Sequence, residues 1–162
     1  MAVDRSKRVT ITYDNRPIPA FAGQSIAGAL YAAGVRTFSR SFKYHRPRGL
    51  LCVAGRCPNC QMNVDGVPNV RVCVEPVRDG TQVRSQNAFP SIEHDLLNVF
   101  DKVDRLLPVG FYYKTFIRPR RLWPAYERVL RNIAGVGSLG QLSGAGEHFE
   151  REYRYTDVAV IG

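Results

Sequence analysis

The sequence lacks the long apolar stretches of membrane and secreted proteins. No apolar run approaches the ~18 residues that span a bilayer, and residues 1–5 have no apolar stretch of the kind found in a secretory signal. With 162 residues, 44% hydrophobic and 23% charged, the chain has the composition of a globular protein. Its length allows one ordinary domain and an appendage. We therefore expect a cytoplasmic protein.

The sequence also lacks the residue sets that act on substrates. It has no Ser/His/Asp set, no carboxylate pair at a useful spacing and no complete phosphate loop. The three histidines are isolated, and we expect His94 and His148 on the surface. His45 is either an ordinary packed or surface histidine or a hydrogen-bond donor behind a metal ligand. We predict no substrate site on this chain.

Positive charge is concentrated in the first half of the chain. Residues 1–90 hold 13 Lys and Arg against 5 Asp and Glu, whereas residues 91–162 hold 10 against 9. A basic region is typical of proteins that bind nucleic acid or an acidic partner. It is equally compatible with a solvated surface, so charge alone does not decide between these interpretations.

All four cysteines lie in this basic half, and their spacing is specific. It is Cys52-x4-Cys57-x2-Cys60-x12-Cys73. The first two gaps match the plant-type [2Fe-2S] pattern, in which the fourth cysteine lies further along the chain. In a reducing compartment such a group is more typical of metal binding than of disulfides. The spacing predicts a [2Fe-2S] cluster with these four cysteines as its ligands.

Two other interpretations of the cysteines remain open at this point. A tetrahedral zinc site also takes four cysteines, and it would make the chain a zinc module with a basic, nucleic-acid-binding face. A zinc ribbon normally has two C-x2-C pairs, however, and this chain has only Cys57-x2-Cys60. Disulfides or buried free thiols are the other alternative. Colour separates the first two, because a [2Fe-2S] protein is red-brown and a zinc protein is colourless.

Six basic residues flank the cysteines in sequence. A [2Fe-2S] cluster gains a negative charge on reduction, so nearby cations favour the reduced state. The same side chains also suit phosphates or an acidic partner, and the sequence does not separate these roles. They are Arg36, Arg40, Lys43, Arg46, Arg48 and Arg56.

Short periodic runs predict a small α+β domain. Residues 9–13 alternate apolar and polar side chains, as a half-buried strand does, and a returning strand is expected around residues 18–20. A helix is expected over residues 25–33, with Gly34 at its C-terminal cap. After a cysteine loop over residues 49–60, further strands are expected at residues 62–64, 70–74 and near Val83. The strand at 70–74 would present Cys73. These pieces form a mixed sheet crossed by one helix.

The second half of the chain has a different pattern. Leu96, Phe100, Val103 and Leu107 have the spacing of an amphipathic helix that Pro108 ends. A second helix is expected over residues 124–134, with Gly135 as its cap. We interpret residues 91–150 as an ordered helical connector. Residues 155–162 contain an apolar run typical of the first strand of a dinucleotide-binding domain, without the glycine-rich turn that binds the pyrophosphate.

Three segments carry a family resemblance. Residues 39–49 (SRSFKYHRPRG), 23–25 (GQS) and 67–73 (VPNVRVC) resemble heterotetrameric sarcosine oxidase alpha chains and their relatives. These relatives are the hydrogen cyanide synthases, opine oxidases and dye-linked amino-acid dehydrogenases. The resemblance covers about residues 8–90 and loosens through the connector.

The resemblance implies a β-grasp, ferredoxin-like fold for residues 8–90. It also implies an FAD-binding domain and a partner flavoprotein subunit that oxidises a secondary amine or amino acid. All four cysteines are present, which implies a dehydrogenase-like member whose electrons leave through a cluster. We therefore expect an electron-transfer subunit of a hetero-oligomer, with FAD on a partner or on a longer form of the chain. Nucleic acid is not expected as a partner.

Overall fold

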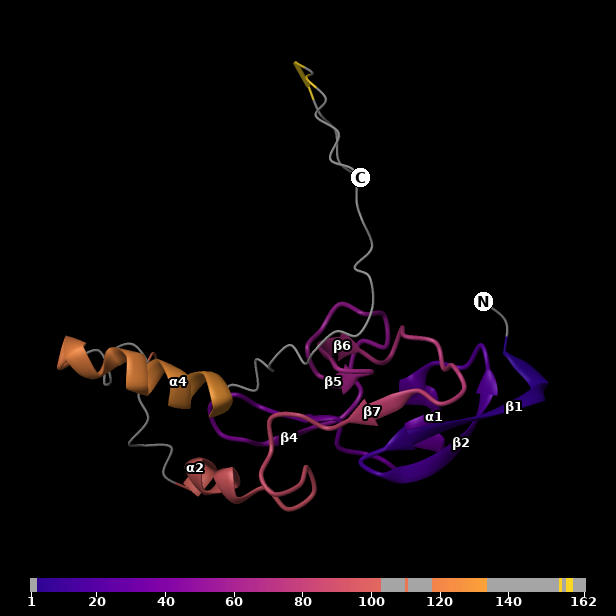
Figure 1. The fold of residues 1–162 in the computed structure, drawn as a ribbon, viewed down its shortest axis with the longest axis horizontal. Coiled ribbons are helices and arrows are strands. Elements are labelled where there is room, and N and C mark those ends of the chain that lie inside the picture. The colour runs from indigo at the N-terminus through magenta and orange to yellow at the C-terminus, as the bar shows by residue number, and fades with distance from the viewer. Residues whose placement is uncertain (1–2, 103–109, 111–117, 134–154, 156, 159–162) are drawn as a thin grey trace.

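A five-stranded sheet with the order β2-β1-β7-β5-β6 forms the centre of the fold (Figure 1). The computed structural model describes residues 3–102, 110, 118–133, 155 and 157–158. The strands are β1 (Asp4–Tyr13), β2 (Arg16–Ala22), β5 (Gln61–Val64), β6 (Val67–Arg71) and β7 (Gln82–Arg84). β1 and β7 run parallel, and the other neighbours are antiparallel. The predicted mixed sheet is confirmed.

The first hairpin follows from its sequence pattern. Val9, Ile11 and Tyr13 are buried on one face of β1, as the alternation predicts. The turn to β2 consists of Asp14 and Asn15, both with positive φ, a conformation that two-residue hairpin turns require. The strand is longer than predicted and begins at Asp4.

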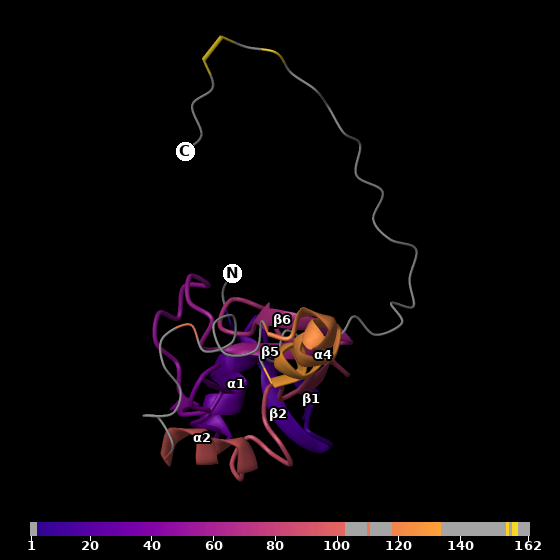
Figure 2. The ribbon, with the colours of Figure 1, turned by 90° about the vertical axis from the view of Figure 1, so that its left-hand side faces the viewer.

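One helix, α1 (Ile26–Ala32), packs against this sheet, as Figures 1 and 2 show. The Ser25 hydroxyl caps its N-terminus by accepting a hydrogen bond from Gly28 N–H at 3.1 Å. Its buried face includes Ile26 and Leu30, both fully buried. Gly34 has a φ of 94°, which a glycine after a helix adopts without strain. The predicted helix and its Gly34 cap are confirmed, and with the sheet they form the expected α+β fold.

Along the chain, a second, two-stranded sheet follows α1 and precedes the cysteine loop. It pairs β3 (Ser39–Arg40) with β4 (Pro47–Arg48) in antiparallel register. No periodicity predicts these strands, because two residues are too few to show a period. The hairpin forms most of the SRSFKYHRPRG segment.

The prediction of a strand over residues 70–74 is partly wrong. β6 ends at Arg71, and residues 72–74 form a turn. The alternation of valines continues past the strand because Val72 is buried against the core while Val74 faces outward. Cys73 is therefore presented by a turn, in which Val74 N–H donates to the carbonyl oxygen of Arg71 at 3.1 Å.

The described residues contain parts of both expected connector helices. A 3-10 turn, η1 (Leu96–Asn98), precedes α2 (Val99–Lys102), whereas the sequence predicts a regular helix from Leu96. Another 3-10 turn, η3 (Arg120–Leu122), precedes α4 (Trp123–Ile133), near the predicted range of 124–134. Residues 103–108, the Gly135 cap and most of the predicted strand at 155–162 lie outside the described residues. Within the described ranges, no helix has the length and apolarity to cross a bilayer.

Candidate metal centre

All four cysteines lie near one end of the main sheet. Three are in the loop between β4 and β5, and the fourth is in the turn after β6. Because β5 and β6 are antiparallel with Gln61 opposite Arg71, the start of one strand adjoins the end of the other. Val72 N–H donates to the carbonyl oxygen of Cys60 at 3.2 Å. This register brings Cys60 and Cys73, which are distant in sequence, next to each other.

The loop directs main-chain N–H groups at sulfur. Cys52 Sγ accepts hydrogen bonds from three of them, those of Ala54, Arg56 and Cys57, at 3.4, 3.3 and 3.4 Å. Such donors stabilise negative charge on a thiolate and on a cluster that it ligates. The arrangement therefore suits a metal-bound thiolate at Cys52 better than a disulfide sulfur, and all four cysteines are free thiols.

A tight turn inside the loop extends this set of donors to Cys73. Gly55 N–H donates to Cys73 Sγ at 3.3 Å and so links the loop to the turn after β6. Val53 and Gly55 both have positive φ, of 50° and 68°. A Cβ on Gly55 would also meet the Val74 side chain at 3.2 Å. Glycine is thus needed at position 55 both for its conformation and for the close approach of Val74.

The two ends of the site hold thiols of different acidity. Hydrogen bonds, of which the one from Ala54 N–H has the largest effect, lower the pKa of the Cys52 thiol to about 6. Burial raises the pKa of the Cys60 thiol to about 11. At neutral pH, Cys52 is therefore a thiolate before any metal binds, whereas Cys60 keeps its proton until a metal displaces it.

The four thiols are linked to one another around the loop. Cys52 interacts with Cys57, and Cys60 interacts with both Cys73 and Cys57. A [2Fe-2S] cluster takes its four thiolates on two irons, whereas a tetrahedral zinc ion needs its ligands around one point. Among the described residues no three His, Cys, Asp or Glu side chains meet closely enough to hold a single ion.

Three apolar side chains next to the cysteines in sequence are exposed. Leu51, Val53 and Val74 are 73%, 58% and 57% exposed, although each is adjacent in sequence to a cysteine. We call these three residues the apolar rim. Exposed apolar groups gathered around a polar centre are typical of a surface that contacts another protein.

The six flanking basic residues do not form a single patch. The Arg36 guanidinium lies 4.0 Å from the ring centroid of Tyr31, and Lys43 Nζ lies 4.5 Å from that of Tyr44. Arg46 is paired with Asp101 at 2.6 Å. These contacts give three of the six cations a local structural role.

The remaining three cations differ in their exposure. Arg40 is only 7% exposed and lies in the interior. Arg48 is half-buried on β4, and Arg56 is exposed in the cysteine loop itself. Of the six, only Arg48 and Arg56 make none of the contacts described above. These two arginines are therefore available to favour the reduced cluster or to bind an acidic partner.

A buried ionic network lies behind the β3–β4 hairpin. His45 Nδ1 is 2.7 Å from Asp95 Oδ2, and both side chains are completely buried. The Arg40 guanidinium donates to the carbonyl oxygens of His45, Ile92 and Glu93. Of the two interpretations of His45, the structure therefore supports an ordinary packed histidine. Its hydrogen-bond partner is Asp95 and not one of the four cysteines. The network fixes the hairpin to residues 92–95.

The sequence analysis missed Asp95. It lies 50 residues from His45 in the chain, in a segment without a motif. Its Oδ1 also accepts hydrogen bonds from the N–H groups of Phe89 and Leu97, both at 3.1 Å. His94, one of the two histidines predicted on the surface, is exposed; His148 lies outside the described residues.

Comparisons with known proteins agree with this geometry. Residues 6–88 match the family model described as a 2Fe-2S iron-sulfur cluster binding domain. The chain is 37% identical to sarcosine oxidase subunit alpha of Rhizobium meliloti over 99% of its own length but only 17% of that protein. It is 32% identical to hydrogen cyanide synthase subunit HcnA of Pseudomonas aeruginosa, over 49% of this chain and 75% of that one. The solved L-proline dehydrogenase from P. horikoshii superposes with a TM-score of 0.45 and 28% identity, over 51% of this chain and 16% of that one.

Proposed function

Because this chain belongs to the family of 2Fe-2S iron-sulfur cluster binding domains, we propose that it is the electron-transfer component of a multi-subunit, flavin-dependent oxidoreductase. The cofactor of this family is a [2Fe-2S] cluster rather than zinc. We propose Cys52, Cys57, Cys60 and Cys73 as its four ligands. The flavin is expected on a partner subunit or on a longer form of the chain, so that the working protein is a hetero-oligomer.

The observation that carries this proposal is the set of N–H groups around Cys52 and Cys73. When bound, the cluster takes up and releases one electron at a time. The N–H groups already point at the sulfurs, so they stabilise the added negative charge without a rearrangement of the loop. The apolar rim keeps the surroundings of the sulfurs partly dry and offers a surface to the electron donor or acceptor.

We further propose that the oxidised substrate contains a C–N bond, as in sarcosine, proline or an opine. The likeness to sarcosine oxidase subunit alpha supports this substrate class. The chain corresponds to only 17% of that subunit, so catalysis would be performed by other parts of the assembly. In this scheme residues 8–90 form the cluster domain, residues 91–150 the connector, and residues 155–162 the first strand of a dinucleotide-binding domain.

Two measurements on the natively purified assembly test the proposal. Iron and acid-labile sulfide should each be present at about two per chain, and dithionite should produce the electron paramagnetic resonance signal of a reduced [2Fe-2S] cluster. Anaerobic sarcosine, L-proline or an opine should then produce the same signal through the flavin. Stoichiometric zinc without iron would overturn the cofactor assignment, and a cluster that stays oxidised with every C–N substrate would overturn the substrate class.

A further inference from the structure

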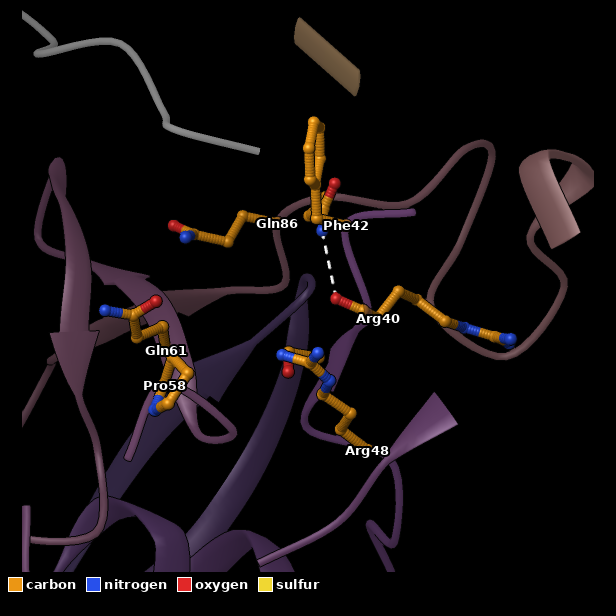
Figure 3. A pocket seen from close by; sticks show the side chains of 8 residues that line it. Arg40, Phe42, Arg48, Pro58, Gln61 and Gln86 are labelled. Atoms are coloured by element: carbon orange, nitrogen blue, oxygen red, sulfur yellow. Dashed lines mark hydrogen bonds between the residues drawn. The ribbon is translucent and has the colours of Figure 1, made fainter. Parts of the chain in front are cut away.

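A pocket of about 250 Å³ lies directly beside the cysteine loop (Figure 3). Pro58, which forms part of its wall, stands between the proposed ligands Cys57 and Cys60. Ser39, which also lines the pocket, donates from its hydroxyl to the carbonyl oxygen of Asn59 at 2.7 Å. The pocket is therefore built partly from the cysteine loop and is fixed to it by a hydrogen bond.

The pocket contains a cation without a partner. Figure 3 shows the Arg48 guanidinium directed toward the middle of the pocket, while the Arg40 guanidinium points away from it. In the described part of the chain, the Arg48 side chain makes no hydrogen bond or ion pair. None of the eight lining residues is acidic. A half-buried arginine that no described residue neutralises favours an anionic occupant.

Amide side chains complete the lining. Gln61 and Gln86 lie together on the side facing Arg48, and the Phe42 ring closes the top in the view of Figure 3. Asn87 donates through Nδ2 to the carbonyl oxygen of Arg40 at 3.0 Å. Its Oδ1 is shielded from solvent and has no hydrogen-bond donor. An occupant that carries hydrogen-bonding groups as well as a negative charge would pair with both Gln61 and Arg48.

We propose that this pocket receives an acidic side chain from a peptide segment of the partner subunit, with the carboxylate held by Arg48. This deepens the proposed function and rests on it. A peptide is favoured over an inorganic anion because its backbone supplies hydrogen-bond partners for the Gln61 amide. The net positive charge of residues 1–90 also favours an acidic partner. The acidic segment would fix the partner beside the loop that carries three of the proposed ligands.

Peptide binding to the full chain with its cluster tests the proposal. The probes are acetyl-Gly-Glu-Gly-Glu-Gly-amide, its counterpart with Gln in place of Glu, and sodium sulfate. Binding is followed by the nitrogen–proton resonances of Arg48 and Gln86 in the oxidised protein. We expect the Glu peptide to bind about tenfold more tightly than the Gln peptide, because its contact with the guanidinium is a charge-assisted hydrogen bond.

Matched variants locate the effect. Arg48→Gln should abolish the preference for the Glu peptide, and Arg48→Lys, which keeps the charge, should retain part of it. Arg8→Gln is the control, since Arg8 is an exposed arginine of β1 that does not line the pocket; it should change the affinity by less than about twofold.

Three results would overturn the proposal. They are equal binding of the two peptides, an equal loss in Arg8→Gln and Arg48→Gln, and binding of sulfate that matches and displaces the Glu peptide. The second result would indicate general charge attraction, and the third a small-anion site. Failure of the proposed function would be seen separately, as missing iron or a missing resonance signal in the wild-type chain.

Discussion

The cysteine loop and the buried network stabilise charge in two different ways. In the loop, main-chain N–H groups of residues 54–57 point at sulfur atoms near the surface. In the network, the side chains of Arg40, His45 and Asp95 are brought together in the interior. In the proposed function, the first arrangement stabilises a charge that changes with each electron. The second arrangement holds the β3–β4 hairpin against residues 92–95.

This difference follows from the cost of desolvation. Buried polar and charged groups depend on hydrogen bonds and ion pairs within the protein, so the network is held by fixed contacts among Arg40, His45 and Asp95. Main-chain dipoles at a partly exposed loop carry no net charge, and they can stabilise either redox state while solvent adjusts. The two regions meet along the β3–β4 hairpin. The hairpin is fixed to the network through Arg40 and His45, and it is fixed to the cysteine loop through Ser39.

The largest effect is expected when a proposed ligand is removed. Cys60→Ser or Cys73→Ser should each remove most of the bound iron and destabilise the sheet, because ligation contributes directly to folding in a small domain. Iron analysis, the resonance signal of the reduced protein and thermal unfolding measure this. The apo form of the wild-type chain is the reference for loss of the cluster. Full iron content in either variant would show that the assignment of that ligand is wrong.

A smaller effect is expected when the network is broken while the loop is left intact. Asp95→Ala leaves His45 and Arg40 without their acidic partner in the interior, which should lower the free energy of unfolding by about 3 kcal/mol. The iron content and the resonance signal should be unchanged in the folded variant. Denaturant unfolding of the cluster-loaded chain measures the loss.

Asp101→Ala is the matched control for this change. Asp101 also pairs with a basic residue of the hairpin segment, Arg46, but 33% and 56% of the two side chains are exposed. Removing an exposed pair should cost less than about 1 kcal/mol. Equal losses in the two variants would contradict the distinction between a buried network and a solvent-screened pair.

Sequence patterns predicted an element or site correctly where the residues that determine it lie close together in the chain. The cluster was predictable because a short loop sets the spacing of Cys52, Cys57 and Cys60. The helix α1 was predictable because its apolar period and the glycine that follows it, Gly34, lie within ten residues. Asp95 was not predictable, since its role depends on contacts 50 residues away that leave no periodic trace. The turn at Cys73 was misinterpreted because a strand and a following turn can share one alternating pattern.

Within the cysteine loop, the more exposed Cys52 and the buried Cys60 are expected to differ in thiol reactivity. In the apo chain at pH 7, iodoacetamide should label Cys52 about 100-fold faster than Cys60, because the lower pKa of Cys52 leaves far more of it as thiolate. The rate at Cys52 should fall as the pH drops below about 6, where its thiolate is protonated. Mass spectrometry of timed samples measures both rates. Equal rates would mean that the N–H groups hold Cys52 only when the cluster is present.

The smallest effect concerns charges that act on the cluster through solvent. Arg48→Gln removes a positive charge beside the cysteine loop, so the oxidised state is favoured and the reduction potential should fall. A unit charge at ~10 Å in water contributes about 0.4 kcal/mol, or roughly 20 mV for one electron, and salt reduces it further. Protein-film voltammetry at low ionic strength resolves such a shift.

Arg46 sharpens this last comparison, because its charge is paired with that of Asp101. Arg46→Gln removes one positive charge and leaves the carboxylate unbalanced, so the potential should fall here as well. The double variant Arg46→Gln/Asp101→Asn removes a charge of each sign, so the potential should return to nearly the wild-type value. Arg48 has no such compensating partner in the described residues. If the double variant stays as low as Arg46→Gln, the shift comes from a displaced hairpin rather than from charge. The exposed pair would then position the loop much as the buried network does.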